Sequence, residues 1–328
     1  MTSLQRSLAV ISLIAMIAGG VWMAQAEEGK SPANCDRGCL DGLIDRYLAA
    51  LVAHDPMRVP SAESVKFTEN TAALKLGEGA WKTATGVGSY QIHIADPVTN
   101  QAAFIGVLKE GGKATMFALR LKAANRRITE IETILARSGL GGVSDLAPSK
   151  LVTSRAAFAQ VLAKPERSAR EKMMAVANSY YEGIERGSGD IVPFAADCHR
   201  IENGVALVNN PGFEFPLRSP SGRKLPNFAA MGCREQFNTR LWTTDSITSR
   251  RFPVIDEERG VAAAFTIYNS HGTKECADVV GIGPVCPAAA GSKPGSLDLL
   301  EFFKIRNGEI HEMESVWTIL PYRTKSGW

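Results

Sequence analysis

The chain has 328 residues, of which 45% are hydrophobic and 22% are charged, and its formal net charge is +3. This length suggests about two domains, and the composition is that of an ordinary globular protein. No cluster of basic residues is interleaved with aromatic ones, so the electrostatic footprint of a nucleic-acid-binding protein is missing. We therefore expect no nucleic-acid partner.

Residues 1–26 have the pattern of an export signal. Arg6 gives a positive start, residues 8–22 form an apolar run, and Ala24-Gln25-Ala26 supplies a cleavage site with small residues. The alternative is an uncleaved membrane anchor, but the apolar run is short for a span of about 20 residues. We expect cleavage after residue 26, a secreted or periplasmic protein, and no membrane partner after cleavage.

All six cysteines follow this segment, and an even number of cysteines in an exported chain favours disulfides. Sequence alone does not select among the possible pairings. Locality suggests three pairs: Cys35 with Cys39, Cys276 with Cys286, and Cys198 with Cys233. No Cys-x-x-Cys pair occurs and the five histidines are scattered, so we predict neither a metal site nor a cofactor.

The first part of the mature chain predicts one helix followed by strands. Apolar residues recur at three- and four-residue spacing from Leu40 to Leu51, which is typical of an amphipathic helix, and Pro56 follows its end. A short strand is expected at residues 65–70. Alternation then predicts four longer strands, at residues 90–94, 102–110, 115–123 and 127–136. A leading helix followed by strands alone indicates an α+β fold with an antiparallel sheet.

Residues 138–167 are rich in Gly, Ser and Pro and predict a linker that contains a short helix near residues 156–162. After this linker a second amphipathic helix opens at Met173, and a strand is expected at residues 198–203. The order of elements therefore starts again.

Landmark residues confirm that the chain contains a diverged internal repeat. The matching pairs, in chain order, are Tyr47 and Tyr180, Glu69 and Glu202, Trp81 and Trp242, Asp96 and Asp256, and Ile128 and Ile310. Their offsets are 133 (180 − 47 and 202 − 69), then 161 and 160 (242 − 81 and 256 − 96), and finally 182 (310 − 128). Rising offsets in a constant order indicate a duplicated domain whose second copy has gained two loops.

We accordingly expect one domain at residues 35–137 and a second at residues 168–323. The first extra loop, of about 27 residues (160 − 133), falls within residues 209–240, and the second, of about 22 residues (182 − 160), contains Cys276 and Cys286. Long ordered loops on a regular scaffold are often functional, which makes the second copy the better candidate for a site.

Three runs of residues carry a resemblance to a known superfamily: Phe67-Thr68-Glu69-Asn70, Gly77-Glu78-Gly79-Ala80-Trp81 and Ile128-Thr129-Glu130-Ile131-Glu132. They resemble the SnoaL-like branch of the nuclear transport factor 2-like superfamily, and more narrowly a family of exported proteins with tandem SnoaL-like units. The resemblance covers about residues 35–322. It implies two cone domains, each a curved antiparallel sheet wrapped around N-terminal helices with a pocket inside, which pack as an intramolecular pseudo-dimer. Because the superfamily includes cyclases, isomerases, dehydratases, hydrolases and plain binding proteins, the fold does not decide the reaction.

Strand alternation singles out one pair of charged residues in the second copy. Arg200 and Glu202 share a strand face, and the equivalent face of the first copy carries Val65 and Phe67, which marks it as inward. Burying Arg and Glu is costly unless they pair or line a wet pocket. One interpretation is a structural ion pair. The other is a pocket in which Glu202 acts as a general base and Arg200 assists.

The side chains of Tyr180 and His199 could act together with Arg200 and Glu202. Tyr180 lies on the buried stripe of its helix, where core packing is the default, but its hydroxyl needs a partner and Glu202 is available. His199 alternates to the other face unless a bulge intervenes. A surface or satisfied histidine is the simpler interpretation, and a catalytic role would rest on its titration near neutral pH.

The remaining candidates also have two interpretations each. Trp242 is either a core anchor or a pocket wall, and Asn203 most simply closes a turn through its amide. Glu312 and Glu314 share a strand face that is either solvated or lines a cavity mouth. The predicted catalytic residues are Glu202, Arg200, Tyr180 and His199, and the predicted substrate-binding residues are Trp242, Asn203, Glu314 and Tyr181.

The sequence therefore predicts a protein that handles a small organic molecule in the pocket of the second copy. The first hypothesis is a lyase, isomerase or hydrolase that works by acid–base chemistry without a cofactor. The second is a non-catalytic binder of a small ligand, and the third is a structural module whose pockets are filled by side chains.

Overall fold

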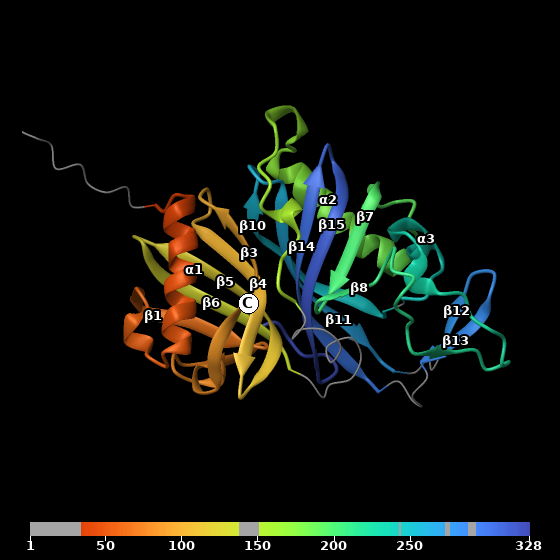
Figure 1. Cartoon of the computed structure of the whole chain (residues 1–328), viewed down its shortest axis with the longest axis horizontal. Coiled ribbons are helices and arrows are strands. Elements are labelled where there is room, and N and C mark those ends of the chain that lie inside the picture. Colours follow the sequence, from red (N-terminus) through yellow and green to blue (C-terminus); the bar gives the residue numbers. More distant parts are fainter. Residues whose placement is uncertain (1–33, 138–150, 243, 273–275, 288–292) are drawn as a thin grey trace, which may run out of the picture. The chain divides into compact units, whose positions relative to one another are not determined.

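Two long helices and two six-stranded sheets make up most of the structure (Figure 1). The computed structural model describes residues 34–137, 151–242, 244–272, 276–287 and 293–328, all within one compact unit. The predicted export signal and residues 138–150 of the predicted linker lie outside the described residues. Among the described helices, none is long and apolar enough to cross a membrane.

The first sheet is preceded by helix α1 (Arg37–Val52), which begins where the Asp36 carboxylate accepts a hydrogen bond from the backbone N–H of Cys39. Its strands are β1 (Ser61–Glu69), β2 (Ala72–Leu74), β3 (Ala84–Asp96), β4 (Gln101–Glu110), β5 (Lys113–Ala124) and β6 (Arg127–Ala136). They lie in the order β2-β1-β6-β5-β4-β3. The predicted helix and strands of this part are confirmed, with β1 and β3 longer than expected, and the short strand β2 was not predicted.

One strand pairing in this sheet corrects the expectation of a purely antiparallel sheet. Strands β1 and β6 run parallel, with Phe67 opposite Ile131, whereas the other neighbouring strands run antiparallel. The physical reason is the path of the chain. It crosses from edge strand β2 to the opposite edge strand β3 and then returns strand by strand, so β6 arrives beside β1 in the same direction.

The second sheet repeats this order strand for strand. Its strands are β7 (Phe194–Glu202), β8 (Val205–Ala206), β10 (Ser246–Asp256), β11 (Val261–Ser270), β14 (Gly295–Arg306) and β15 (Glu309–Leu320). They lie in the order β8-β7-β15-β14-β11-β10, and β7 and β15 again run parallel. Helix α2 (Arg170–Arg186) precedes them and ends at Gly187, whose φ of 59° is readily adopted by glycine. The predicted linker helix is a single 3₁₀ turn at Ala156–Phe158.

The two segments that the sequence marks as extra form a small structure of their own. Strand β9 (Leu217–Arg218) and helix α3 (Cys233–Asn238) come from the first segment, and strands β12 (Ala277–Val279) and β13 (Gly283–Pro287) come from the second. They join in a three-stranded sheet of order β12-β13-β9. The two extra segments are therefore paired with each other.

The six cysteines form the three pairs that locality suggested: Cys35–Cys39, Cys198–Cys233 and Cys276–Cys286. The second pair ties α3 to strand β7. The third closes the β12–β13 hairpin.

Both faces of each sheet are buried. The apolar stripe of α1 packs on one face of the first sheet, and that of α2 packs on one face of the second sheet. The opposite faces pack against each other, where Tyr90 and Ile134 of the first sheet share an apolar cluster with Phe265 and Phe302 of the second. The two sheets are thus stacked face to face, and apolar burial on both sides is the main stabilising term.

Contacts across this stack are reciprocal. Asp256 of the second sheet forms an ion pair with Arg37 of α1 at 2.6 Å and accepts a hydrogen bond from the backbone N–H of Ala95. Asp96 of the first sheet forms an ion pair with Arg170 of α2 and accepts from the backbone N–H of Ile255 at 3.0 Å. Each contact thereby has its counterpart at the equivalent position, as in an isologous two-fold interface.

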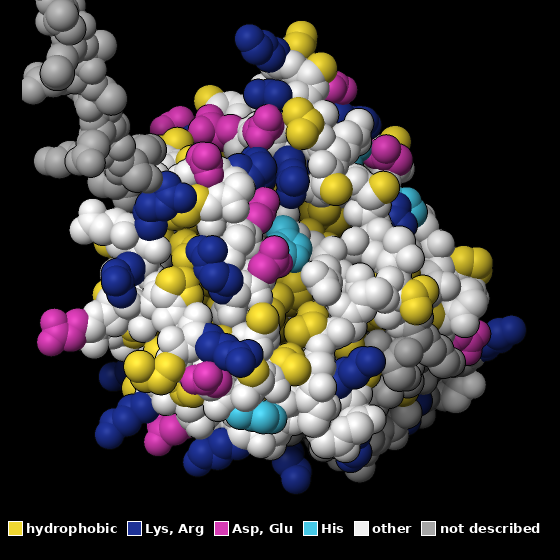
Figure 2. All heavy atoms as spheres, turned by 60° about the vertical axis from the view of Figure 1, so that its left-hand side comes forward, with side chains coloured by type: hydrophobic (Ala, Val, Ile, Leu, Met, Phe, Trp, Pro, Cys, Tyr) yellow, Lys and Arg dark blue, Asp and Glu magenta, His cyan; other side chains and the backbone are white. Residues whose placement is uncertain are grey.

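The surface carries charges of both signs. On the face shown in Figure 2, basic and acidic side chains are interspersed, and the described residues of that face form no extended patch of one sign.

Candidate functional site

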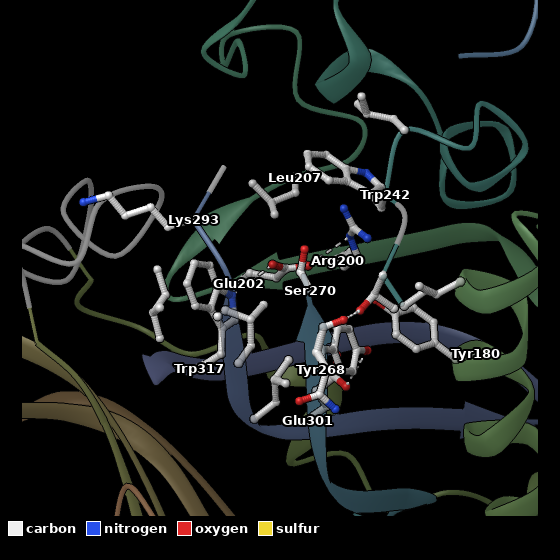
Figure 3. Close-up of a pocket in the computed structure, with 18 residues that line it drawn as sticks. Tyr180, Arg200, Glu202, Leu207, Trp242, Tyr268, Ser270, Lys293, Glu301 and Trp317 are labelled. Atoms are coloured by element: carbon white, nitrogen blue, oxygen red, sulfur yellow. Dashed lines mark hydrogen bonds and ion pairs between the residues drawn. The ribbon is translucent and has the colours of Figure 1, made fainter. Parts of the chain in front are cut away.

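A cavity of about 340 Å³ opens beside the second sheet, between helix α2 and the extra segments (Figure 3). Strands β7, β11, β14 and β15 supply most of its lining, and residues 207, 241 and 242 flank the first extra segment. Four of the eight predicted site residues line it: Tyr180, Arg200, Glu202 and Trp242.

The Arg200–Glu202 pair lies in the wall of this cavity. Both side chains project from β7 on the same face, because residues two apart in a strand point the same way. The Nε atom of Arg200 is 3.6 Å from Oε1 of Glu202, and the indole N–H of Trp317 donates to Oε2 of Glu202 at 3.0 Å. Arg200 is 4% exposed, whereas the Glu202 side chain is 21% exposed. Both residues line the cavity, and Glu202 is the more accessible member of the pair.

Sequence reasoning missed a second carboxyl group in the cavity, that of Glu301 on β14. It is buried, and the hydroxyl of Tyr268 donates to its Oε2 atom at 3.3 Å. Burial and, to a smaller extent, the charge of Glu202 raise the pKa of Glu301 to about 8, because the hydroxyls of Tyr181 and Tyr268 and the Arg200 cation offset these effects only in part. Glu301 therefore carries a proton at neutral pH.

The two tyrosines of α2 lie behind these carboxyl groups. Tyr180 lines the cavity beside Arg200, and Tyr181 lies beside Glu301 without lining the cavity. Burial raises the pKa of both phenols well above the ordinary range, so both remain protonated and take part as neutral hydrogen-bond donors or acceptors. The core packing expected for Tyr180 is also present, since its ring packs against Phe237 at 5.0 Å.

Apolar side chains form much of the rest of the wall. Trp242 and Trp317 lie on two sides of the polar group (Figure 3). Six aliphatic residues also line the cavity: Ile184, Leu207, Leu241, Leu297, Leu299 and Ile319. A largely apolar cavity with a few convergent polar groups is the usual form of a small-molecule site.

Two of these polar residues have apolar counterparts around α1. Phe67 stands where the second sheet has Arg200 (200 − 67 = 133). Leu119 pairs with Thr133 as Glu301 pairs with Ser315, so Leu119 corresponds to Glu301 (315 − 133 = 182 and 301 − 119 = 182). Both Phe67 and Leu119 belong to the apolar core beneath α1. Arg200 and Glu301 are therefore specific to the second sheet, whereas Glu202 and Tyr180 have the polar counterparts Glu69 and Tyr47.

The structure places the other predicted residues elsewhere. His199 points away from the Arg200 face and is not among the residues that line the cavity. Asn203 is fully buried, and its amide both donates to and accepts from the backbone of Trp317 at 3.0 Å. The amide of Asn70 makes the same pair of contacts with Leu135 in the first sheet. The two asparagines therefore tie the ends of β7 and β1 to the neighbouring strands β15 and β6.

Glu314 faces the first sheet instead of the cavity. It is fully buried next to Tyr90 of β3, and burial raises its pKa to about 8. Its neighbour on that face, Glu312, accepts two hydrogen bonds from Arg155 of the linker at 2.5 and 3.0 Å. The site roles proposed for His199, Asn203 and Glu314 remain predictions. Within the described ranges, no three His, Cys, Asp or Glu side chains lie close enough together to hold a metal ion.

The missed residue Glu301 had one signal in the sequence. It is the only charged residue in the run Leu299-Leu300-Glu301-Phe302-Phe303, and a lone carboxyl group in an apolar strand must be protonated or paired. The other missed residues, Tyr268 and Trp317, have no distinguishing local pattern.

Fold and cavity together define a mixed α/β protein with two large sheets, few helices and a small-molecule-sized cavity on one of them. A family model described as a domain of unknown function (DUF8021) matches residues 166–317, from just before α2 into β15. A comparison with curated proteins gives no match.

Several solved structures resemble parts of the chain. A de novo designed protein with a curved β-sheet is 14% identical, with 31% of this chain and 88% of that one covered and a TM-score of 0.27. An NTF2-like protein of unknown function from Cytophaga hutchinsonii ATCC 33406 is 14% identical, with 29% and 88% covered and a TM-score of 0.24. A protein of unknown function with a cystatin-like fold from Methylobium petroleophilum PM1 is 19% identical, with 42% and 99% covered and a TM-score of 0.26. At these TM-scores the likeness to the solved structures assigns no function to this chain.

Proposed function

We propose that this chain is an exported protein of two tandem SnoaL-like cone domains, in which the second domain acts on a small organic molecule by acid–base chemistry without a cofactor. The proposed domains are residues 35–137 and 168–323, packed as an intramolecular pseudo-dimer. The identical strand orders and the reciprocal pairs Arg37–Asp256 and Arg170–Asp96 support this organisation. Three disulfides are in keeping with an oxidising compartment and therefore with export.

The observation that carries the proposed chemistry is the presence of two carboxyl groups with different surroundings in one cavity. Glu301 is buried and its raised pKa keeps it protonated at neutral pH, whereas Glu202 is partly exposed beside the Arg200 cation. Carboxyl groups whose environments differ in this way can divide the roles of acid and base. We assign the acid to Glu301 and the base to Glu202.

The roles imply a simple proton balance. Glu202 removes a proton from the bound molecule, and Glu301 donates one to an oxygen or carbon atom elsewhere on it. This leaves the substrate with no net gain of protons, as an isomerisation, an elimination or a hydration requires. Solvent at the cavity mouth then restores both carboxyl groups, and Arg200 and Tyr180 hold the polar end of the molecule while Trp242 and Trp317 cover its apolar part.

A specific observation also favours the alternative, a non-catalytic small-ligand-binding protein. One oxygen of each carboxyl group already accepts a hydrogen bond. The donor is the Trp317 indole at Glu202 and the Tyr268 hydroxyl at Glu301. A site of this kind can orient a ligand without reacting with it. The open cavity argues against the third hypothesis, a module whose pockets are filled by side chains.

The test uses the mature protein and a library of small cyclic and aromatic metabolites, with binding measured by thermal shift and conversion by NMR. We expect a compound that is bound and converted by the wild type, with conversion at least about 100-fold slower in Glu202→Gln and Glu301→Gln. The control is Asp298→Asn, because Asp298 lies on the same strand, is equally buried, has a pKa raised by burial to about 8, and faces the other sheet. A compound that binds and is returned unchanged would establish the binding alternative. Conversion that survives both glutamine substitutions would refute the assignment of the site.

A further inference from the structure

One buried amide, that of Gln236 on α3, joins two walls of the cavity. Its Oε1 atom accepts a hydrogen bond from Nη2 of Arg200 at 2.6 Å and from the indole N–H of Trp242 at 3.2 Å. Its Nε2 atom donates to the backbone carbonyls of Leu207 at 2.7 Å and Phe228 at 2.9 Å. Gln236 is fully buried and does not line the cavity.

These four contacts use the full capacity of the side chain and determine its orientation. The backbone carbonyls of Leu207 and Phe228 can only accept hydrogen bonds, so they require the NH₂ group of the amide. The Arg200 guanidinium and the Trp242 indole N–H can only donate, so they require the amide oxygen. No other uncharged side chain of this length offers two donors and a double acceptor. The chemistry of the four partners therefore selects glutamine.

The frame around Gln236 is rigid. The disulfide Cys198–Cys233 joins the first residue of α3 to strand β7, two residues before Arg200. It therefore links covalently the two elements that carry Gln236 and Arg200. The next residue of α3, Phe237, packs against Tyr180 and against Phe194 at 5.1 Å. The helix lies in a segment that the first half of the chain lacks.

We propose that Gln236 is a positioning residue of the cavity, which holds the Arg200 guanidinium apart from Glu202 and directs the Trp242 ring into the wall. This inference rests on the proposed function of the cavity. The Arg200–Glu202 separation of 3.6 Å is wider than the roughly 2.8 Å of a close charge-assisted hydrogen bond. The contact with Gln236 is the short one, at 2.6 Å. Without it we expect the buried guanidinium to close on Glu202, the oppositely charged group beside it, and to occupy the carboxylate that the proposed reaction needs.

The experiment compares Gln236→Met, which keeps the length but has no polar oxygen or nitrogen, with Gln236→Glu, which keeps the acceptor. The readouts are the ¹⁵N–¹H signals of the Arg200 Nε–H and the Trp242 indole N–H, together with conversion of any library compound. In Gln236→Met we expect both signals to move and the Trp242 indole proton to exchange about tenfold faster, as loss of one hydrogen bond implies. In Gln236→Glu we expect the Trp242 signal to stay near its wild-type position.

The matched control is Asn238→Ala. The amide of Asn238 lies on the same short helix but binds the backbone of Gly189 and the carboxylate of Asp190, away from the cavity. This control should leave both reporter signals in place even if it lowers stability.

Each result of this experiment either supports or overturns the positioning role of Gln236. Signals that do not move in folded Gln236→Met overturn the inference. If that variant does not fold, Gln236→Glu decides, since a displaced Trp242 signal there would overturn it and a retained one would support it. Failure of the proposed function looks different, because the signals would move as expected while no compound is bound or converted by the wild type.

Discussion

The protonation of Glu301 at neutral pH has a measurable consequence for stability. Its pKa is raised from an ordinary 4.5 to about 8 in the folded protein, chiefly by burial. The folded state therefore keeps a proton that the unfolded chain releases above pH 4.5, and stability must fall as the pH rises. The contribution is fully present below pH 4.5 and is lost as the pH rises through about 8. Between pH 5 and pH 8, linkage gives a loss of about 3 to 4 kcal/mol from this one group.

The perturbation is Glu301→Gln, which keeps the shape of the side chain and its contact with Tyr268 but cannot ionise. We expect urea unfolding at pH 5, 6.5 and 8 to show that the variant loses about 3 kcal/mol less than the wild type over this range. Glu63→Gln, at an exposed glutamate, serves as the control and should follow the wild type. If Glu301→Gln follows the wild type as well, Glu301 is not protonated in the folded state and its assignment as the acid fails.

Two further predictions concern the framework. Asp256→Ala should destabilise the protein by about 3 kcal/mol in urea unfolding, because Arg37 loses its fully buried partner. The control is Glu258→Gln, at the exposed partner of the same arginine, which should cost less than about 1 kcal/mol. Equal losses would show that the pair does not hold the sheets together. Replacing Cys198 and Cys233 together by Ala should cost about 3 to 4 kcal/mol for a bridge that spans 35 residues, and a change below about 1 kcal/mol would contradict a role in stabilising the fold.

Periodicity was sufficient to predict the helices. The stripe from Leu40 to Leu51 becomes the buried face of α1, and the equivalent stripe with Tyr180 becomes the buried face of α2. A helix that packs on a sheet with one side shows this pattern whatever it packs against, so local sequence suffices. The strand β6 was likewise predicted over residues 127–136, where turns mark both ends.

The same reasoning was insufficient for the faces of the strands. In β4, residues 101–108 are all buried, so alternation disappears and the sequence contains no signal for which side meets the helix. Both sides are buried because the second sheet covers the side that the helix does not. This is why Glu314, expected at a cavity mouth, lies between the sheets, and why Glu301 was not expected in the cavity at all.

The sequence by itself predicted the elements, their repetition and one charged pair, Arg200 and Glu202, because each depends on local spacing or on comparison between the two halves. It suggested the cysteine pairs by locality without selecting among the possible pairings. Only the tertiary structure decided which residues meet. It stacked the sheets, placed Glu301 in the same cavity as Glu202, and brought Gln236 from an extra segment onto Arg200. The physical reason is that these contacts join residues far apart in the chain, and the free energy that selects them comes from burial on both faces of each sheet.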